Sequence, residues 1–227
     1  MFQQQNPQEF TIPRTNVTPT FFGKVMTGFA LAILVTVVGV WAGFNYFLEY
    51  FVTNPALIWV VFIGEFALIL TSGMWSTKRP LNYILFSLFA FLSGVTVTPI
   101  LLLATVTGGS GVVIKALLAT FLTFTAAGII GWTTKKTLEG LGGFLMIGLI
   151  GMLITGIIGM FIPWSNSFEM IYSGIGVLLF AGYAVYDFNM IKRYPEDRYI
   201  DAAMHLYLDI FNLFIFILRL LMSQNNR

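Results

Sequence analysis

The sequence contains no cysteine, only one histidine and few charges: 10% of its 227 residues are Asp, Glu, Lys or Arg. The absence of cysteine excludes a disulfide scaffold, thiol catalysis and thiolate metal sites. A single histidine excludes an HExxH metalloprotease and any multi-histidine zinc site. Soluble domains carry charge on roughly a quarter of their residues. Because 57% of this chain is hydrophobic and its mean hydropathy is +0.84, the composition predicts an integral membrane protein.

Apolar segments long enough to cross a bilayer fill most of the chain. A spanning helix needs about 20 apolar residues, and seven segments meet that requirement. They are predicted at roughly residues 25–47, 55–75, 81–106, 112–132, 141–162, 168–191 and 201–222. Residues 1–20 are polar and lack the apolar core of a signal peptide, which predicts a cytoplasmic N-terminal tail. The predicted fold is therefore an all-α membrane domain of seven transmembrane helices over residues 21–227.

The distribution of basic residues predicts the orientation. If the N-terminus is cytoplasmic, the inner side carries nine of the twelve Lys and Arg residues: Arg14, Lys24, Lys78, Arg79, Lys135, Lys136, Lys192, Arg193 and Arg198. The outer side carries Lys115, Arg219 and Arg227. Cytoplasmic loops are enriched in basic residues, so we expect this orientation. An odd number of spans then places the C-terminus outside.

Three acidic residues fall inside the predicted spans: Glu65, Asp187 and Asp209. An intramembrane carboxylate is costly, so each is a candidate functional residue. Asp187 precedes the cytoplasmic end of the sixth helix, and Asp209 follows the start of the seventh from the same side. At 1.5 Å per residue both lie roughly 8–12 Å from the boundary. Because helices joined by a short loop are usually antiparallel neighbours, we expect the two carboxyl groups to face each other.

Two carboxyl groups in contact cannot both ionise cheaply, so they titrate as a unit. The pair is therefore a candidate pH sensor, a cation site, or both, although each aspartate could instead hydrogen-bond a neighbouring helix and stabilise the bundle. Helical spacing places four candidate supporting residues around it: Tyr183, Asn189, His205 and Asn212. The two asparagines are interpreted as interhelical hydrogen-bond donors. Glu65 could line a pathway, pair with a buried base or make a structural hydrogen bond.

Three segments of the sequence resemble motifs of the Bax inhibitor-1 family. The segment YLDIFNLF at residues 207–214, followed by Leu218 and Arg219, is similar to the helix 7 signature. YDFNMI at residues 186–191 resembles the helix 6 motif, and SGVTVTP at residues 93–99 resembles the helix 3 motif. Glu65 falls where many members have a helix 2 glutamate, and the similarity extends from residue 22 to residue 221.

The resemblance implies a seven-helix fold with helix 7 at its centre and a pH-sensitive calcium leak. Asp187 and Asp209 would form the sensor and gate and contact the passing calcium ion, with no bound cofactor. Some members carry an arginine at the end of helix 2 that reaches the helix 6 aspartate. Here that turn reads MWST at residues 74–77, so the candidate latch bases are Lys78 and Arg79. The short form of the chain resembles the bacterial branch, which implies the plasma (inner) membrane.

The leading functional hypothesis is a calcium-permeable leak channel gated by the aspartate pair. The first alternative is a non-conducting membrane protein that modulates a membrane protease or another partner. The second is a cation- or proton-coupled transporter. An enzyme is not expected, because the chain has no GxSxG elbow, no second histidine and no glycine-rich phosphate loop. The expected partners are the lipid bilayer and calcium ions, and no nucleic acid.

Overall fold

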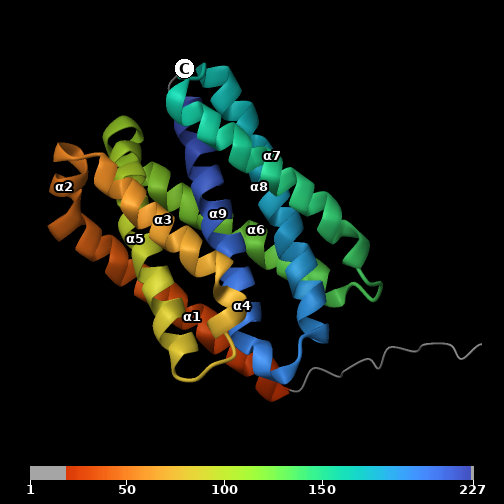
Figure 1. Cartoon of the computed structure of the whole chain (residues 1–227). Coiled ribbons are helices and arrows are strands. Elements are labelled where there is room, and N and C mark those ends of the chain that lie inside the picture. Colours follow the sequence, from red (N-terminus) through yellow and green to blue (C-terminus); the bar gives the residue numbers. More distant parts are fainter. Residues whose placement is uncertain (1–18, 226–227) are drawn as a thin grey trace, which may run out of the picture.

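The structure, a computed structural model, describes residues 19–225, and every regular element in that range is helical (Figure 1). The main helices are α1 (Pro19–Ala42), α2 (Leu48–Thr53), α3 (Ala56–Leu70), α4 (Ser72–Trp75), α5 (Leu81–Gly108), α6 (Ser110–Thr133), α7 (Glu139–Phe161), α8 (Asn166–Met190) and α9 (Tyr199–Asn225). A π-helical turn at Gly43–Phe47 joins α1 to α2, and two 3-10 turns, Ile191–Arg193 and Glu196–Arg198, join α8 to α9. The all-α fold class is thus confirmed for this range. The expected polar tail lies outside the described residues, apart from the last two of its twenty, which begin α1.

Six helical segments of the described chain are long and apolar enough to cross a membrane. They are Thr20–Thr53, Leu81–Gly108, Ser110–Thr133, Glu139–Gly159, Asn166–Arg193 and Glu196–Gln224. They correspond to six of the seven predicted spans, although the first continues through the π-helical turn and α2 and is longer than expected. The remaining predicted span, near residues 55–75, is divided into α3 and α4. Since α3 has only 15 residues, the count of seven stays a prediction.

The division between α3 and α4 occurs at Thr71, which has non-helical backbone angles (φ −93°, ψ 1°). The Thr71 hydroxyl donates to the carbonyl of Ala67 one turn earlier, at 2.7 Å, and accepts from Trp75 Nε1 at 3.3 Å. A threonine hydroxyl bonded to the carbonyl one turn earlier tends to bend a helix. Hydropathy does not register such a bend, which is why the sequence predicted one continuous span.

Helix α9 runs through the middle of the bundle and packs against α1, α5, α6 and α8 (Figure 1). Four of its large side chains, Leu206, Tyr207, Leu213 and Leu218, have no exposed surface. The polar residues Asp201, His205, Asp209 and Asn212 recur every three or four positions, so they share one face of α9. That face meets α8, and the candidate site is built there.

Helices α1 and α5 pack tightly against each other at Gly39 and Gly94. A Cβ atom added to Gly39 would lie 2.2 Å from the Phe91 carbonyl oxygen, and one added to Gly94 would lie 2.2 Å from the Thr36 carbonyl oxygen. Small residues allow membrane helices to pack backbone to backbone in this way. The contact fixes α1 against α5 and positions Thr36 beside α9.

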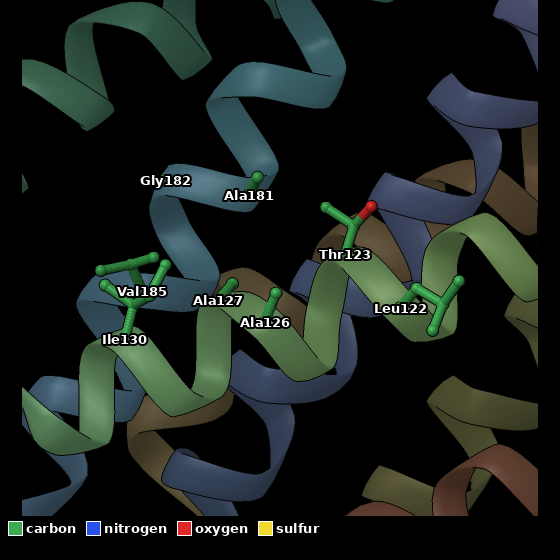
Figure 2. Close-up of a pocket in the computed structure, with 8 residues that line it drawn as sticks. All are labelled: Leu122, Thr123, Ala126, Ala127, Ile130, Ala181, Gly182 and Val185. Atoms are coloured by element: carbon green, nitrogen blue, oxygen red, sulfur yellow. The ribbon is translucent and has the colours of Figure 1, made fainter.

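An apolar groove of about 510 Å³ lies between α6 and α8 (Figure 2). Small side chains from both helices line it, including Ala126, Ala127 and Ala181, and Thr123 is its one polar lining residue. None of the candidate site residues lines this groove. The polar site is therefore separate from it.

Candidate functional site

Asp187 on α8 and Asp209 on α9 lie together, as their matched depth in the two helices suggested. Their residues are 4% and 3% exposed, and the two carboxyl groups are within hydrogen-bonding range of each other. Two carboxyl groups can hydrogen-bond to each other only when one of them carries a proton, because both are otherwise acceptors. The arrangement can therefore bind a proton between two helices.

His205 joins the pair from one turn earlier on α9. Its Nδ1 atom lies 3.6 Å from Oδ2 of Asp187, and 48% of the His205 side chain is exposed at the protein surface. Asp201, a further turn back, is 7% exposed and also interacts electrostatically with His205. Asp201 lies in the first turn of α9, and the spacing of Asp201, His205 and Asp209 at every fourth residue places all three on one face of the helix.

Tyr194, in the turn between α8 and α9, closes the site at that end. Its ring centroid lies 6.3 Å from that of His205. Burial raises the pKa of the Tyr194 hydroxyl, and the nearby charges of Asp187 and Asp201 raise it further. The Tyr194 hydroxyl therefore stays neutral at physiological pH.

Three polar atoms in this region are buried and have no hydrogen-bond partner within the described range: Tyr183 Oη, Asp201 Oδ2 and Asp209 Oδ2. Tyr183 lies one turn before Asp187 and interacts electrostatically with both aspartates of the pair. Buried polar atoms are nearly always paired, so unpaired ones mark positions with another role. The described residues contain no group of three or more acids or histidines that could hold a resident metal ion.

Asn189, a candidate supporting residue, ties the loop after α6 to α8. Its Nδ2 atom donates to the carbonyl oxygens of Thr134 at 3.0 Å and Lys136 at 3.2 Å. Its Oδ1 atom accepts from the backbone nitrogen of Leu138 at 3.2 Å. These bonds satisfy backbone groups left unpaired where a helix ends. Asn189 is positioned to support the loop rather than to contact an ion.

Asn212 does not make the interhelical hydrogen bond that was expected from the sequence. Its Nδ2 atom donates to the carbonyl oxygen of Leu208 at 2.8 Å, which is one turn earlier on the same helix. The structure therefore does not bring this amide to a neighbouring helix. The sequence spacing identified the correct face of α9 but could not choose between an intrahelical and an interhelical acceptor.

The structure brings neither candidate latch base to Asp187. Arg79 instead donates from Nε to the Tyr199 hydroxyl at 3.1 Å, and Lys78 forms no ion pair within residues 19–225. Tyr199 begins α9, ten residues before Asp209, which corresponds to about 15 Å along a helix. The basic side chain beside Asp187 is instead His205, which helical spacing had placed among the candidate supporting residues.

Glu65 on α3 is 7% exposed and accepts a hydrogen bond from Thr96 Oγ1 at 3.3 Å. Ser93, one turn earlier on α5, lies close enough to interact with this carboxyl group, while its hydroxyl donates to the Phe89 carbonyl oxygen at 3.0 Å. The Tyr207 hydroxyl on α9 interacts with Ser93 and lies 2.8 Å from Thr36 Oγ1 on α1. A buried polar network therefore connects α3, α5, α9 and α1. The sequence left three roles open for Glu65. The structure places its carboxyl group beside hydroxyl donors and not beside a base.

The opposite ends of α8 and α9 are held by an ion pair. Arg219 Nε lies 2.6 Å from Oε1 of Glu169, and the guanidinium lies 5.7 Å from the centroid of the Tyr172 ring. Asn166 Nδ2 also donates to the carbonyl oxygen of Ser223 at 2.9 Å. The two helices are thus tied at one end by charges of opposite sign, and meet at the other through two acids.

The fold and this site define a class of protein: a helical membrane protein in which a buried carboxyl pair joins a central helix to its neighbour. The model of the family described as "Inhibitor of apoptosis-promoting Bax1" matches residues 18–226. The chain belongs to this Bax inhibitor-1 family.

Relatives extend over nearly the whole chain. An uncharacterized protein of Campylobacter jejuni is 29% identical over 221 residues, which cover 97% of this chain and 95% of that protein. Protein lifeguard 4 of mouse is 32% identical over 218 residues, covering 93% of this chain and 88% of that protein. Bax inhibitor 1 of Schizosaccharomyces pombe is 34% identical over 149 residues, covering 65% and 54% respectively. Relatives of this chain therefore occur in both bacteria and eukaryotes.

Proposed function

We propose that the protein is a pH-sensitive, calcium-permeable leak channel gated by Asp187 and Asp209. The observation that supports this proposal is the contact between two buried carboxyl groups on adjacent helices. Loss of the shared proton leaves two negative charges in a poorly hydrated place, where their repulsion is strong. Because the Glu169–Arg219 ion pair holds the far ends of α8 and α9, the helices separate at the end that carries the acids.

His205 adds a second charge change to the same gate. An unperturbed histidine titrates near neutral pH, and His205 lies beside Asp187. At low pH a positive His205 and one shared proton leave the group of three side chains with no net charge. At high pH the same group carries two negative charges. The gate thus converts a small change in pH into a large change in local charge.

We place the chain in a bacterial plasma (inner) membrane, with the N-terminus in the cytoplasm and the C-terminus outside. Bacterial relatives and the excess of Lys and Arg at one end of the predicted spans support this location. The proposal assigns no enzymatic activity and no cofactor, and its partners are the bilayer and the permeating calcium ion. The aspartate pair then gates the cytoplasmic mouth of the pathway.

Calcium flux into liposomes tests the proposal directly. We expect liposomes that contain only this protein to admit calcium faster than empty liposomes, with no energy source. A flux that requires a proton gradient would instead identify a coupled transporter. The absence of flux at every pH would contradict the proposal and leave the alternative of a non-conducting protein that modulates a membrane protease or another partner.

Glu65 is proposed to attract calcium within the pathway. Replacement by glutamine keeps the shape and the hydrogen bond from Thr96 but removes the negative charge. Glu65→Gln is therefore expected to lower calcium flux severalfold, since acidic side chains along a pathway favour cations. Glu49→Gln, a substitution of an exposed glutamate on α2, is the matched control. Unchanged flux combined with a lower melting temperature would assign Glu65 to helix packing instead.

A further inference from the structure

A groove of about 390 Å³ lies where α1, α5 and α9 begin or end at the same face of the bundle. In Figure 1 the red start of α1, the yellow start of α5 and the blue start of α9 meet there, at the lower end of the view. Gly23 and Lys24 line it from α1, Tyr83 and Phe86 from α5, and Tyr199 from α9. The acid pair is not part of this groove, and nothing in the proposed channel function uses it.

Two cations gather around one tyrosine at the mouth of the groove. Lys24 Nζ lies 6.0 Å from the centroid of the Tyr199 ring, and Arg79 Cζ lies 5.4 Å from it. Arg79 also donates from Nε to the Tyr199 hydroxyl, which lies 2.6 Å from the Tyr83 hydroxyl. Across the described chain, no carboxylate lies within ion-pair distance of either base. Two positive charges beside one ring, with no carboxylate paired to them in the described residues, favour an anion at this place.

The groove changes from polar to apolar along its length. On α1 it extends from Thr20 to Ala32, which is about 18 Å of helix. Leu31 and Ala32 of α1 and Phe86 of α5 supply its apolar lining. The groove is open beside Gly23, where an added Cβ atom would meet nothing within 4 Å. A ligand that fits this surface has an anionic head and an apolar tail.

We propose that this groove binds an anionic phospholipid of the surrounding bilayer. The phosphate sits between Lys24 and Arg79, where the free guanidinium nitrogens of Arg79 form charge-assisted hydrogen bonds to its oxygens. An acyl chain follows α1 past Gly23 toward Leu31. Basic pockets between membrane helices bind anionic headgroups by this chemistry. Charge complementarity selects phosphatidylglycerol-type lipids over zwitterionic ones, whose own ammonium group would meet the two bases.

Retention of phospholipid by the purified full-length protein tests the charge requirement. The protein is reconstituted with equal amounts of phosphatidylglycerol and phosphatidylcholine, extracted in detergent and analysed by native mass spectrometry. We expect phosphatidylglycerol to be retained preferentially. The double variant Lys24→Gln/Arg79→Gln should weaken this retention about tenfold or more, the effect of losing charged hydrogen bonds. Lys135→Gln/Lys136→Gln, which removes two exposed bases outside the groove, should retain as much as the parent.

A second variant tests the shape of the groove without changing charge. Gly23→Leu places a side chain in the open entrance, so it should also abolish preferential retention. Gly151→Leu, at an equally open position on α7, should not. Equal retention of both lipids by the parent, or full retention by both groove variants, would overturn the proposal. Displacement of the lipid by millimolar inorganic phosphate alone would also overturn it, since the site would then recognise a free anion.

Discussion

Replacing either aspartate of the pair, by Asp187→Asn or Asp209→Asn, is expected to flatten the pH dependence of calcium flux between about pH 5 and 8. The physical reason is the size of the repulsion between two ionised carboxylates. Unit charges about 4 Å apart repel by about 4 kcal/mol at an effective dielectric constant near 20. A single remaining carboxyl group has no second carboxyl group with which to share a proton, and no second negative charge to repel it. Calcium flux into liposomes, measured at a series of pH values, gives the comparison directly.

The double variant Asp187→Asn/Asp209→Asn should behave like either single variant if the pair acts as one unit. Asp197→Asn, at an exposed acid in the turn before α9, serves as the control and should keep the parental pH dependence. The baseline flux of the two single variants need not agree, because Asp187 alone faces His205 Nδ1 at ion-pair distance. If both single variants keep the full pH response, the gate lies elsewhere, and His205→Gln becomes the next variant to measure.

The six long helices could be predicted from the sequence because a membrane-spanning helix requires a long, continuous apolar stretch, which hydropathy detects directly. The predicted ends of five of them fall within about two or three residues of the helices α5, α6, α7, α8 and α9. The division of the second predicted span at Thr71 could not be predicted in this way. It depends on the backbone angles of one residue and on a hydroxyl hydrogen bond, neither of which changes hydropathy.

The contact between Asp187 and Asp209 could be predicted from the sequence. Asp187 lies shortly before the end of its helix and Asp209 shortly after the start of the next one, which placed both residues at one depth. The place of His205 beside Asp187 required the rotation of α9 about its own axis, which depends on packing against four other helices. The same rotation decides that Arg79 meets Tyr199. Residue spacing identifies a shared helix face, but only the packed bundle determines which neighbour that face meets.

The contact between α1 and α5 provides the prediction with the largest expected effect on stability. In Gly94→Ala the added methyl group would lie 2.2 Å from the Thr36 carbonyl oxygen and 2.9 Å from the Gly39 Cα atom. Both neighbours are backbone, so they cannot rotate away as a side chain would. We expect a loss of about 2–3 kcal/mol in the free energy of unfolding, and a melting temperature lower by roughly 5–10 °C. Thermal unfolding of the purified protein in detergent measures the change.

Gly151→Ala is the matched control for this substitution, because a Cβ atom added to Gly151 on α7 meets nothing within 4 Å. The two variants differ only in what surrounds the new methyl group, and alanine has the higher helix propensity at both sites. Gly151→Ala should therefore leave the melting temperature unchanged or raise it slightly. Gly94→Ala also displaces Thr36, whose hydroxyl lies 2.8 Å from that of Tyr207 on α9. If Gly94→Ala is as stable as its control, α1 and α5 do not pack backbone to backbone at this point.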